Sequence, residues 1–440
     1  MNILMFNTYS PYRASGIVAL DLFNQLQKKG HKVKLLVNRY NPTYPEGVVS
    51  IESHPMSLKR TTLYKFQWRY EKLKSYLKIK TKDLTNPDYR IFQLNEQKLI
   101  YNTDLLIKKA SIKPDAIIIL FVKKFINAKN IYELHSKTKA PVFWLMYDMA
   151  PLTGGCHYSW DCTGYQNNCG NCPGLFSSNP HDITYENISF KRNYLSKTQI
   201  EIITASGWQF QQAKRSSLFK DNPVHNVLLS VDSTIFKPGD KDQIRLKLNI
   251  PLNKKILFFG SVGLSEKRKG MHYLIESLKI LKQDLELSGK LSSEEIVLLI
   301  AGGEVGQIID NLPFRYHFLG MVSNTYGIAS AYEAADVFIC PSIEDSGPMM
   351  INQSLMCGTP VVSFEMGVAF DLVITGKTGY RAKLKDTNDL AKGIMNILTL
   401  DKANYSKMAD NCRKLALELC SPDVQSAKIE QILKNEPYQQ

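Results

Sequence analysis

Two cations in the second half of the chain follow an apolar run at a spacing that suits phosphate chemistry. The run 255–260 predicts a buried strand ending at Gly260, and Arg268 and Lys269 then stand at the start of an amphipathic helical pattern. Adjacent cations at a helix start favour binding of a diphosphate, because guanidinium and ammonium groups both neutralise phosphate oxygens. We therefore take Gly260, Ser261, Arg268 and Lys269 as candidate site residues. The alternative is a solvated basic turn.

A pair of acidic residues lies in the equivalent position after another apolar run. Glu344 and Asp345 follow the predicted strand 337–340, and a helical pattern begins at Pro348. The free N–H groups at a helix start bind anions, and a carboxylate beside them can accept hydrogen bonds from sugar hydroxyls. The alternative is an ordinary turn in which Asp345 caps the helix. The candidate residues at this helix start are Ser346, Gly347, Pro348 and Met349.

A single glycine occupies a comparable place in the first half of the chain. Gly16 follows the apolar run 2–6 and a polar loop, at the start of a helical pattern. Without a side chain, this glycine allows a phosphate to approach the backbone. The segment is not a G-x-G-x-x-G fingerprint, so we do not expect a nicotinamide cofactor.

Four of the eight cysteines form a cluster in the sequence. The cluster spans 17 residues and ends in a C-x2-C pair; its members are Cys156, Cys162, Cys169 and Cys172. Four thiolates suit tetrahedral structural zinc, and His157 could replace one of them. Two disulfides or four free thiols are the alternatives. The other cysteines stand at apolar or helical positions and are expected in the core: Cys340, Cys357, Cys412 and Cys420.

The segment 58–82 combines positive charge with an apolar stripe. It carries nine Lys or Arg residues and one Glu, while Leu63, Phe66 and Tyr70 recur at helical spacing. A basic amphipathic helix of this kind is typical of elements that bind an anionic membrane surface. The alternative is that the stripe packs on the first domain while the charges are solvated.

Composition limits the classes of protein that remain. The 440 residues are 44% hydrophobic and 22% charged, which excludes wholesale disorder. No apolar run approaches the ~20 residues of a spanning helix, and the first residues do not resemble a secretory signal. We therefore expect a cytoplasmic protein with reduced thiols. The formal net charge of +14 favours an anionic partner: nucleic acid, an acidic membrane surface or a phosphorylated ligand.

Apolar runs and amphipathic helical patterns alternate in two series along the chain. This alternation predicts an α/β fold of two doubly wound, Rossmann-like domains with parallel sheets covered on both faces. We expect an N-terminal domain over 1–228, including the Cys-rich loop 151–175, and a C-terminal domain over 229–420. A Ser-Pro pair predicts the start of a separate helix, and we expect 421–440 to pack back on the first domain. Ligand sites of such domains lie at the carboxyl ends of the strands, here facing a shared cleft.

These segments together resemble a known family. Residues 255–380 are similar to the donor-binding domain of glycosyltransferase family 4, a retaining group with the GT-B fold, and the resemblance covers most of the chain. It implies that a nucleotide-diphosphate sugar binds mainly to the second domain and the acceptor mainly to the first. The resemblance rests on Lys269-Gly270, Ile300–Gly303, Phe318–Val322, Ala331–Asp345 and Cys357–Phe364, together with Gly16, Thr204–Phe210 and Ser230–Pro238.

The resemblance implies roles for individual residues of the second domain. Lys269 and Arg268 would stabilise the departing diphosphate, where negative charge grows in the transition state. Glu344 and Asp345 would contact the donor sugar. Gln353 stands where the family has an acidic residue on the ribose hydroxyls; an amide can accept one hydrogen bond and donate another, but it lacks the charge.

Other positions also depart from the family pattern. Ser261 stands where the family has an Arg, and Arg268 would supply the missing charge. The pair Tyr147-Asp148 stands where the family often has His-Asp, so Asp148 would contact the sugar or the acceptor. The family needs no metal for catalysis. The Cys-rich loop resembles a loop of some bacterial family 4 enzymes for surface polysaccharides and would border the acceptor.

We therefore expect a retaining glycosyltransferase. It would move a sugar from a nucleotide-diphosphate sugar to a hydroxyl of a glycan or lipid-linked glycan in cell-surface polysaccharide biosynthesis. It would be cytoplasmic, with 58–82 as a peripheral contact at the inner face of the membrane, and it would not bind nucleic acid. The alternatives are a catalytically weakened glycan-binding protein of the same fold and a basic zinc-bearing nucleic-acid binder.

Overall fold

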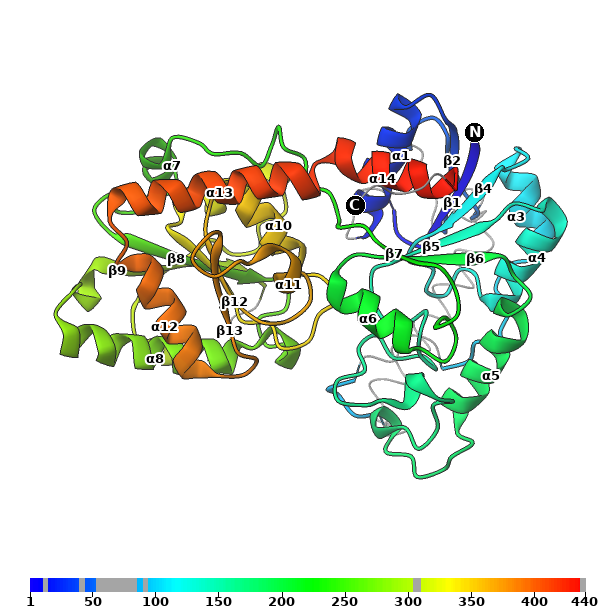
Figure 1. The fold of residues 1–440 in the computed structure, drawn as a ribbon, viewed down its shortest axis with the longest axis horizontal. Coiled ribbons are helices and arrows are strands. Elements are labelled where there is room, and N and C mark those ends of the chain that lie inside the picture. Colours follow the sequence, from blue (N-terminus) through cyan, green and yellow to red (C-terminus); the bar gives the residue numbers. More distant parts are fainter. Residues whose placement is uncertain (11–14, 39–43, 53–84, 90–93, 304–309, 436–440) are drawn as a thin grey trace, which may run out of the picture. The chain divides into compact units, whose positions relative to one another are not determined.

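The chain folds into two compact units. The computed structural model describes residues 1–10, 15–38, 44–52, 85–89, 94–303 and 310–435. One unit comprises residues 1–202 and 215–223, and the other comprises residues 203–214 and 224–440 (Figure 1). The segment 58–82, with its predicted basic helix, lies outside the described residues.

The first sheet has seven strands in the order β3-β2-β1-β4-β5-β6-β7, and β1 is parallel to both β2 and β4. Its central strands are short apolar runs whose side chains are buried on both faces, as expected where helices cover a parallel sheet. The strands are β1 (Asn2–Asn7), β2 (Lys32–Val37), β3 (Val48–Ser50), β4 (Ala116–Ile119), β5 (Val142–Met146), β6 (Ile200–Thr204) and β7 (Val224–Asn226). The helices between them are α1 (Ser15–Lys28), α3 (Thr103–Ala110), α4 (Ala128–Thr138), α5 (Ile183–Leu195) and α6 (Gly207–Arg215), with the 3-10 turns η1 (Gly164–Gln166) and η2 (Pro173–Leu175).

The second sheet has six strands in the order β10-β9-β8-β11-β12-β13, and every neighbouring pair is parallel. The strands are β8 (Lys255–Ser261), β9 (Ile296–Gly302), β10 (Arg315–Phe318), β11 (Val337–Cys340), β12 (Val361–Phe364) and β13 (Gly379–Ala382). The helices are α7 (Lys241–Lys247), α8 (Met271–Ser288), α9 (Thr325–Ala334), α10 (Met349–Met356), α11 (Ala369–Leu372), α12 (Thr387–Leu398), α13 (Lys402–Cys420) and α14 (Pro422–Leu433), with the 3-10 turns η3 (Lys267–Lys269) and η4 (Ser293–Glu295).

Both sheets reverse their strand order at one point. The first sheet does so between β1 and β4, and the second between β8 and β11. Loops that leave the carboxyl ends of such neighbouring strands diverge to opposite faces, and open α/β sheets bind ligands in the crevice this creates. The topology therefore directs attention to the loops that follow these four strands.

The strands expected at 2–6, 255–260 and 337–340 are present as β1, β8 and β11, with ends shifted by at most one residue. The strands β3, β7 and β13 were not expected, and each lies at an edge of its sheet. An edge strand is only half covered, so it needs no continuous apolar run that would make it visible in the sequence. The two-domain α/β architecture is confirmed.

The last helix begins where the sequence predicted. Ser421 is the N-cap of α14, and its hydroxyl accepts a hydrogen bond from the N–H of Val424. Gln425, on the first turn, donates to the carbonyl of Leu228 (3.1 Å) and accepts from the hydroxyl of Ser230 (2.8 Å). These bonds attach α14 to the segment that precedes the second sheet. Its position against the first sheet stays a prediction, as does the domain boundary near residue 228.

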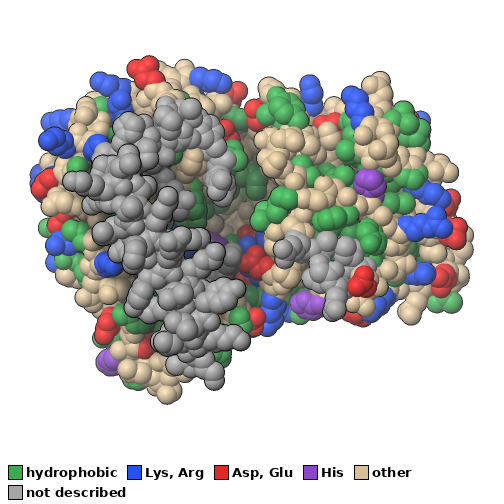
Figure 2. All heavy atoms as spheres, turned by 180° about the vertical axis from the view of Figure 1, so that it is seen from behind, with side chains coloured by type: hydrophobic (Ala, Val, Ile, Leu, Met, Phe, Trp, Pro, Cys, Tyr) green, Lys and Arg blue, Asp and Glu red, His purple; other side chains and the backbone are tan. Residues whose placement is uncertain are grey.

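Charged side chains are widely distributed on the surface. On the face shown in Figure 2, the described Lys and Arg side chains are spread out and lie among acidic ones. Among the described residues, no helix is both long enough and apolar enough to cross a membrane.

Candidate functional site

The switch point of the second sheet carries a cluster of four charged side chains. Asp345 follows β11, while Glu266, Arg268 and Lys269 lie in and just before η3, which follows β8. The Oδ2 atom of Asp345 accepts from Nη1 of Arg268 (2.7 Å) and from Nζ of Lys269 (2.6 Å). Arg268 also pairs with Glu266 (Nε–Oε1 3.0 Å). The predicted proximity of Lys269 and Asp345 is therefore what the structure shows.

These charges are largely removed from water. The exposed fractions of the side chains are 10% for Asp345, 11% for Arg268 and 21% for Lys269. Charges in such a place interact more strongly than at an open surface, and they need partners to offset their lost hydration. Glu344 is also buried, next to this cluster in the chain. The alternative of a solvated basic turn does not fit this arrangement.

The geometry of the turn before α8 depends on a glycine. Gly270 has φ +70°, and a Cβ atom on it would lie 1.8 Å from the carbonyl oxygen of Pro341. The same approach of the two loops allows the N–H of Ile343 to donate to the carbonyl of Arg268 (2.8 Å). Only glycine tolerates both this φ and this close approach. Gly270 therefore allows the loop after β8 to pack against the loop after β11.

The start of α10 lies directly after the acidic pair. Its N-cap position is held by Pro348, not by Asp345, and Ser346 and Gly347 precede it. The hydroxyl of Ser346 is buried, and no described residue hydrogen-bonds to it. On the same helix, Oε1 of Gln353 accepts from the hydroxyl of Tyr332 (3.1 Å). Five of the predicted donor-binding residues thus lie on α10 or the loop before it: Ser346, Gly347, Pro348, Met349 and Gln353. Two others, Gly260 and Ser261, end the neighbouring strand β8.

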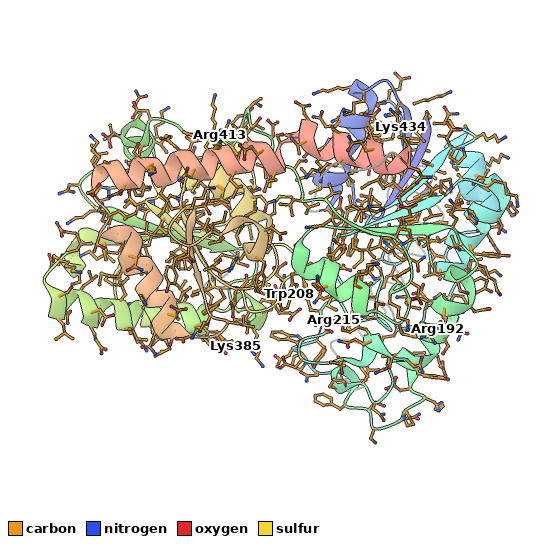
Figure 3. The ribbon with its side chains drawn as sticks, viewed as in Figure 1. Arg192, Trp208, Arg215, Lys385, Arg413 and Lys434 are labelled. Carbon is orange, nitrogen blue, oxygen red and sulfur yellow. The ribbon has the colours of Figure 1, made fainter. Side chains whose placement is uncertain are left out.

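The start of α6 is attached to this part of the second unit. The N–H of Gly207 donates to both carboxylate oxygens of Asp371 (3.1 and 3.0 Å), and the Trp208 ring stacks on Phe370 at 5.6 Å (Figure 3). The hydroxyl of Ser206 donates to the carbonyl of Ser346. Burial raises the pKa of Asp371, although the bond from Gly207 opposes this. No sequence pattern marked Asp371.

In the first unit, a cavity of about 60 Å³ lies at the carboxyl ends of β4 and β5. Asp148 lines it, and Oδ2 of Asp148 is 2.9 Å from Nδ1 of His157. The sequence placed Tyr147 where the resembling family often has histidine, and the structure brings a histidine to Asp148 from nine residues further on. The hydroxyl of Tyr147 is buried, without a hydrogen-bond partner among the described residues. The polar or charged residues lining the cavity are Glu96, Lys123, Asn127, Tyr147, Asp148 and Lys191.

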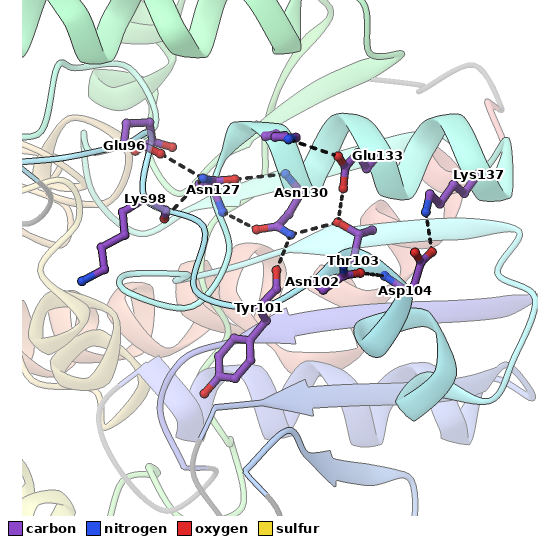
Figure 4. A network of polar contacts seen from close by, with 11 residues as sticks. Glu96, Lys98, Tyr101, Asn102, Thr103, Asp104, Asn127, Asn130, Glu133 and Lys137 are labelled. Atoms are coloured by element: carbon purple, nitrogen blue, oxygen red, sulfur yellow. Dashed lines mark hydrogen bonds and ion pairs between the residues drawn. The ribbon is translucent and has the colours of Figure 1, made fainter.

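A network of polar contacts fixes one wall of this cavity (Figure 4). Asn127 is the N-cap of α4 and exchanges side-chain and backbone hydrogen bonds with Asn130, which forms a capping box. Asn127 also donates to the carbonyl of Glu96 (2.9 Å), and the Glu96 carboxylate accepts from the N–H of Ala128 (3.1 Å). The start of α4 and the segment around Glu96 therefore hold each other in place.

A polar stripe on α5 holds the Cys-rich loop. Thr184, Asn187 and Lys191 are buried on this helix. The ammonium group of Lys191 donates to the carbonyl oxygens of Ala150 (2.6 Å) and Thr153 (2.8 Å). Asn187 donates to the carbonyl of Gly154 (2.7 Å), and the hydroxyl of Thr184 accepts from the N–H of Gly170 (3.1 Å). The helix thus replaces the water that these loop backbone groups lose.

The four clustered cysteines line one small cavity within this loop. They are free thiols in the structure. Burial raises the pKa of Cys156 to about 12 and that of Cys169 to about 11, so the bare thiols are protonated and unreactive near neutral pH. Within the described part of the chain, no three His, Cys, Asp or Glu side chains are already arranged closely enough to hold a metal ion.

Gly16 lies in the first turn of α1, the helix that follows β1. It is buried, and the hydroxyl of Ser15 donates to Oδ1 of Asn7 (3.4 Å) at the end of β1. The structure places Gly16 and Asp148 in the first unit. The other predicted catalytic and donor-binding residues lie in the second unit. The sequence had no means of finding Asp371 or Lys191, because their partners are distant in the chain. Glu266 was missed as well, although its partner Arg268 is only two residues away.

Comparison with known proteins defines the fold first. Sucrose-phosphate synthase from Thermosynechococcus elongatus superimposes with a TM-score of 0.65 at 17% identity, covering 99% of this chain and 98% of that one. HepE of Anabaena, solved with UDP and glucose, gives a TM-score of 0.60 at 15% identity, covering 99% and 100%. Identities this low show the fold alone. The chain therefore has the GT-B fold, as expected.

Sequence relatives then indicate the family of the second unit. Residues 240–418 match the family described as "Glycosyl transferases group 1", from the start of α7 into α13, and so contain the second sheet and its charged cluster. D-inositol 3-phosphate glycosyltransferase 1 of Catenulispora acidiphila is 29% identical over 168 residues, 36% of this chain and 38% of the relative. Alpha-maltose-1-phosphate synthase of Mycolicibacterium smegmatis is 23% identical over 215 residues, 45% and 52%. The chain thus spans about half or less of the length of these curated relatives.

Proposed function

We propose that this protein is a retaining glycosyltransferase that moves a sugar from a nucleotide-diphosphate sugar to a hydroxyl of a glycan or lipid-linked glycan. The observation that carries the proposal is the cluster of Asp345 with Arg268 and Lys269 at the switch point of the second sheet. Open α/β sheets bind ligands at this position, and the matched family covers this segment.

The cluster is suited to a ligand that carries a diphosphate. Without donor, the Asp345 carboxylate holds both cations in place. When a diphosphate binds, it takes over the cations, and Asp345 becomes available to accept from sugar hydroxyls. Groups fixed in this way stabilise the charge of a departing diphosphate without reorganising during the reaction.

The proposed transfer needs no covalent intermediate. The acceptor oxygen attacks the anomeric carbon on the face from which the diphosphate leaves. The bond between that carbon and the diphosphate oxygen breaks, the electron pair stays on the diphosphate, and a leaving-group oxygen takes the acceptor proton. The protein's contribution is to position the reactants and to stabilise charge.

We assign the acceptor to the first unit, at the cavity by the carboxyl ends of β4 and β5. Asp148 lines this cavity and pairs with His157. One relative is named as a D-inositol 3-phosphate glycosyltransferase, and another as a synthase of alpha-maltose-1-phosphate. A phosphorylated acceptor is therefore a second candidate, and Lys123 at the cavity wall favours it. A role in surface polysaccharide synthesis and a membrane contact through 58–82 belong to the same proposal.

The proposal is tested by donor binding. Thermal shifts of the purified chain are measured with UDP-, GDP- and ADP-sugars, beginning with UDP-glucose, which is bound in a solved structure of HepE. At ~100-fold excess over its dissociation constant, a true donor should stabilise the folded chain by about 2–3 kcal/mol. Lys269→Ala should abolish the shift. Lys267→Ala is the matched control, because Lys267 is exposed in the same turn and should leave the shift unchanged.

Two results would count against the proposal. A shift that survives in Lys269→Ala would remove this residue from the site, and the absence of a shift with any sugar nucleotide would remove the function. A catalytically weakened glycan binder of the same fold would bind sugar nucleotides without slow hydrolysis of the donor. A nucleic-acid binder would instead show polynucleotide binding with a steep dependence on salt.

A further inference from the structure

We propose that Cys156, Cys162, Cys169 and Cys172 bind one structural zinc ion that closes the loop between β5 and α5. This inference is independent of the proposed glycosyl transfer, since it concerns only how the loop is held. It adds a metal site of the first unit to the fold, outside the cavity that Asp148 lines.

The position of the four cysteines supports a shared ligand. All four line one cavity of about 20 Å³, together with the backbone of Gly154, Gly155 and Gly170. A Cβ atom on Gly164 would lie 3.4 Å from Sγ of Cys162 and 3.9 Å from Sγ of Cys169, so these two sulfur atoms face the same point. A space of this size holds one small ion, whereas a four-iron cluster needs far more room.

Backbone N–H groups point at the sulfur atoms, as they do where thiolates are bound. The N–H of Gly164 donates to Sγ of Cys162 (3.4 Å). The sulfur of Cys172 accepts from the N–H groups of Gly174 and Leu175, and that of Cys169 from Gly154. Such donors favour the charged form of sulfur. The sulfur of a protonated thiol accepts such bonds only weakly, so their presence at three of the four cysteines favours a thiolate ligand set.

The backbone of the C-x2-C turn is shaped for two sulfur atoms to face inward. Cys169, Gly170 and Asn171 all have positive φ, at +55°, +82° and +46°. A run of such residues costs conformational energy, because only glycine adopts this region freely. Asp182 holds the turn by accepting from the N–H of Cys172 (2.9 Å). The surrounding structure thus maintains a turn of unfavourable backbone conformation, and a ligand bound by Cys169 and Cys172 would account for it.

Zinc fits this set better than the alternatives. Tetrahedral sets of four sulfur ligands are typical of zinc or of iron, and the small cavity between these side chains suits a single ion better than a cluster. The described sulfur atoms are not yet at ligand distance from one centre. Zinc binding would therefore rotate the four side chains inward and release one proton from each thiol to solvent.

The experiment is metal analysis of the full chain, purified without added metal or chelator. Elemental analysis should find about one zinc per chain. Cys172→Ala should lose it, while Cys420→Ala, which removes a buried cysteine of the second unit, should keep it. Titration of the native chain with a mercurial thiol reagent gives a second measurement that does not depend on the variants, because it should release one zinc as the clustered thiols react.

Each other outcome would overturn the inference. Less than half an equivalent of zinc with all thiols reactive would show a loop held without metal. Less than half an equivalent of zinc, together with fewer reactive thiols and a chain mass lowered by two hydrogens for each bond, would show disulfides. Iron in place of zinc, or zinc retained by Cys172→Ala, would also contradict the proposal.

Discussion

At the scale of single residues, the candidate donor site combines expected residue types with partners that no motif specifies. Arg268 and Lys269 are paired with Asp345, so each group predicted to contact the ligand also holds another in position. Gln353 is the clearest departure from the resembling family. Its Oε1 atom accepts from Tyr332, so the amide is oriented by the protein before any ligand arrives.

The role of Gln353 can be tested by restoring the charge. In Gln353→Glu, a carboxylate oxygen can still accept from Tyr332, and the other can accept from a ribose hydroxyl. Because hydrogen bonds to charged groups are stronger by about 1 kcal/mol, we expect UDP to bind roughly fivefold more tightly by calorimetry. Gln353→Ala should weaken binding. Equal affinities in all three proteins would show that residue 353 does not contact the ribose.

At the scale of elements, the loop that follows Asp148 depends on α5. This helix has buried polar side chains where an amphipathic helix would bury apolar ones, and three of them bond to the backbone of the Cys-rich loop. His157 lies on the same loop and reaches Asp148. The helix therefore holds the loop that places His157 beside Asp148, and its own Lys191 lines the same cavity as Asp148.

Replacing Lys191 tests this dependence. Lys191→Met keeps the length of the buried side chain but leaves the carbonyls of Ala150 and Thr153 without their donor. Each unsatisfied group costs about 1–3 kcal/mol, so we expect faster hydrogen exchange across 151–175. The control is Lys197→Met, at an exposed position beyond the end of the same helix, which should change exchange little. Unchanged exchange in Lys191→Met would contradict the assigned role.

At the scale of the whole second unit, charged side chains join segments that are distant in the sequence. Arg413, on α13, donates to the carbonyls of Phe236 (2.7 Å), Met356 (2.6 Å) and Ser233 (3.1 Å), which ties this helix to the start of the unit (Figure 3). Asp336, before β11, accepts from Arg245 of α7 (2.8 Å) and from the N–H of Ile256 (2.7 Å). Single charged side chains thus join α7 to the sheet, and α13 to α10 and the segment around Phe236.

Asp336 should make the stability of this unit sensitive to acid. Burial alone would raise the pKa of Asp336, but the charges of Lys241 and Arg245 outweigh burial and the pKa lies below its usual range. Lys241 has the larger effect of the two cations on the pKa of Asp336, although burial lowers the pKa of Lys241 itself despite this pairing. A carboxyl with a lowered folded-state pKa contributes stability above its unfolded value, about 3.9, and loses that contribution as the pH falls through the folded value.

Urea unfolding of the full chain between pH 3 and pH 7 measures this contribution. We expect Asp336→Asn to be less stable than the native chain near neutral pH, with the difference shrinking below about pH 4. The exposed Asp410→Asn, on α13, controls for the change of charge and should stay within about 0.5 kcal/mol of the native chain. A difference between Asp336→Asn and the native chain that is constant with pH would show that the carboxylate charge is not responsible.

The sequence by itself determined the architecture of this protein and the location of its candidate donor site. Short apolar runs alternating with amphipathic patterns specify parallel strands and helices, because each element must bury its apolar face. The residues at the ends of β8 and β11 could be named in advance, since parallel strands bring their carboxyl ends to one edge of a sheet. The short edge strands β3, β7 and β13 were missed because half-covered strands carry a weaker pattern.

Only the tertiary structure decided which charged and polar groups meet. The pairing of Asp345 with Arg268 and the attachment of α5 to the Cys-rich loop depend on distances between segments far apart in the chain. The pairing of Asp148 with His157, nine residues apart, depends on the path of the loop between them. Residue types state which interactions are possible, but burial decides which must form, because a charge removed from water requires a partner. That requirement is set by packing in three dimensions, which no local pattern of residues records.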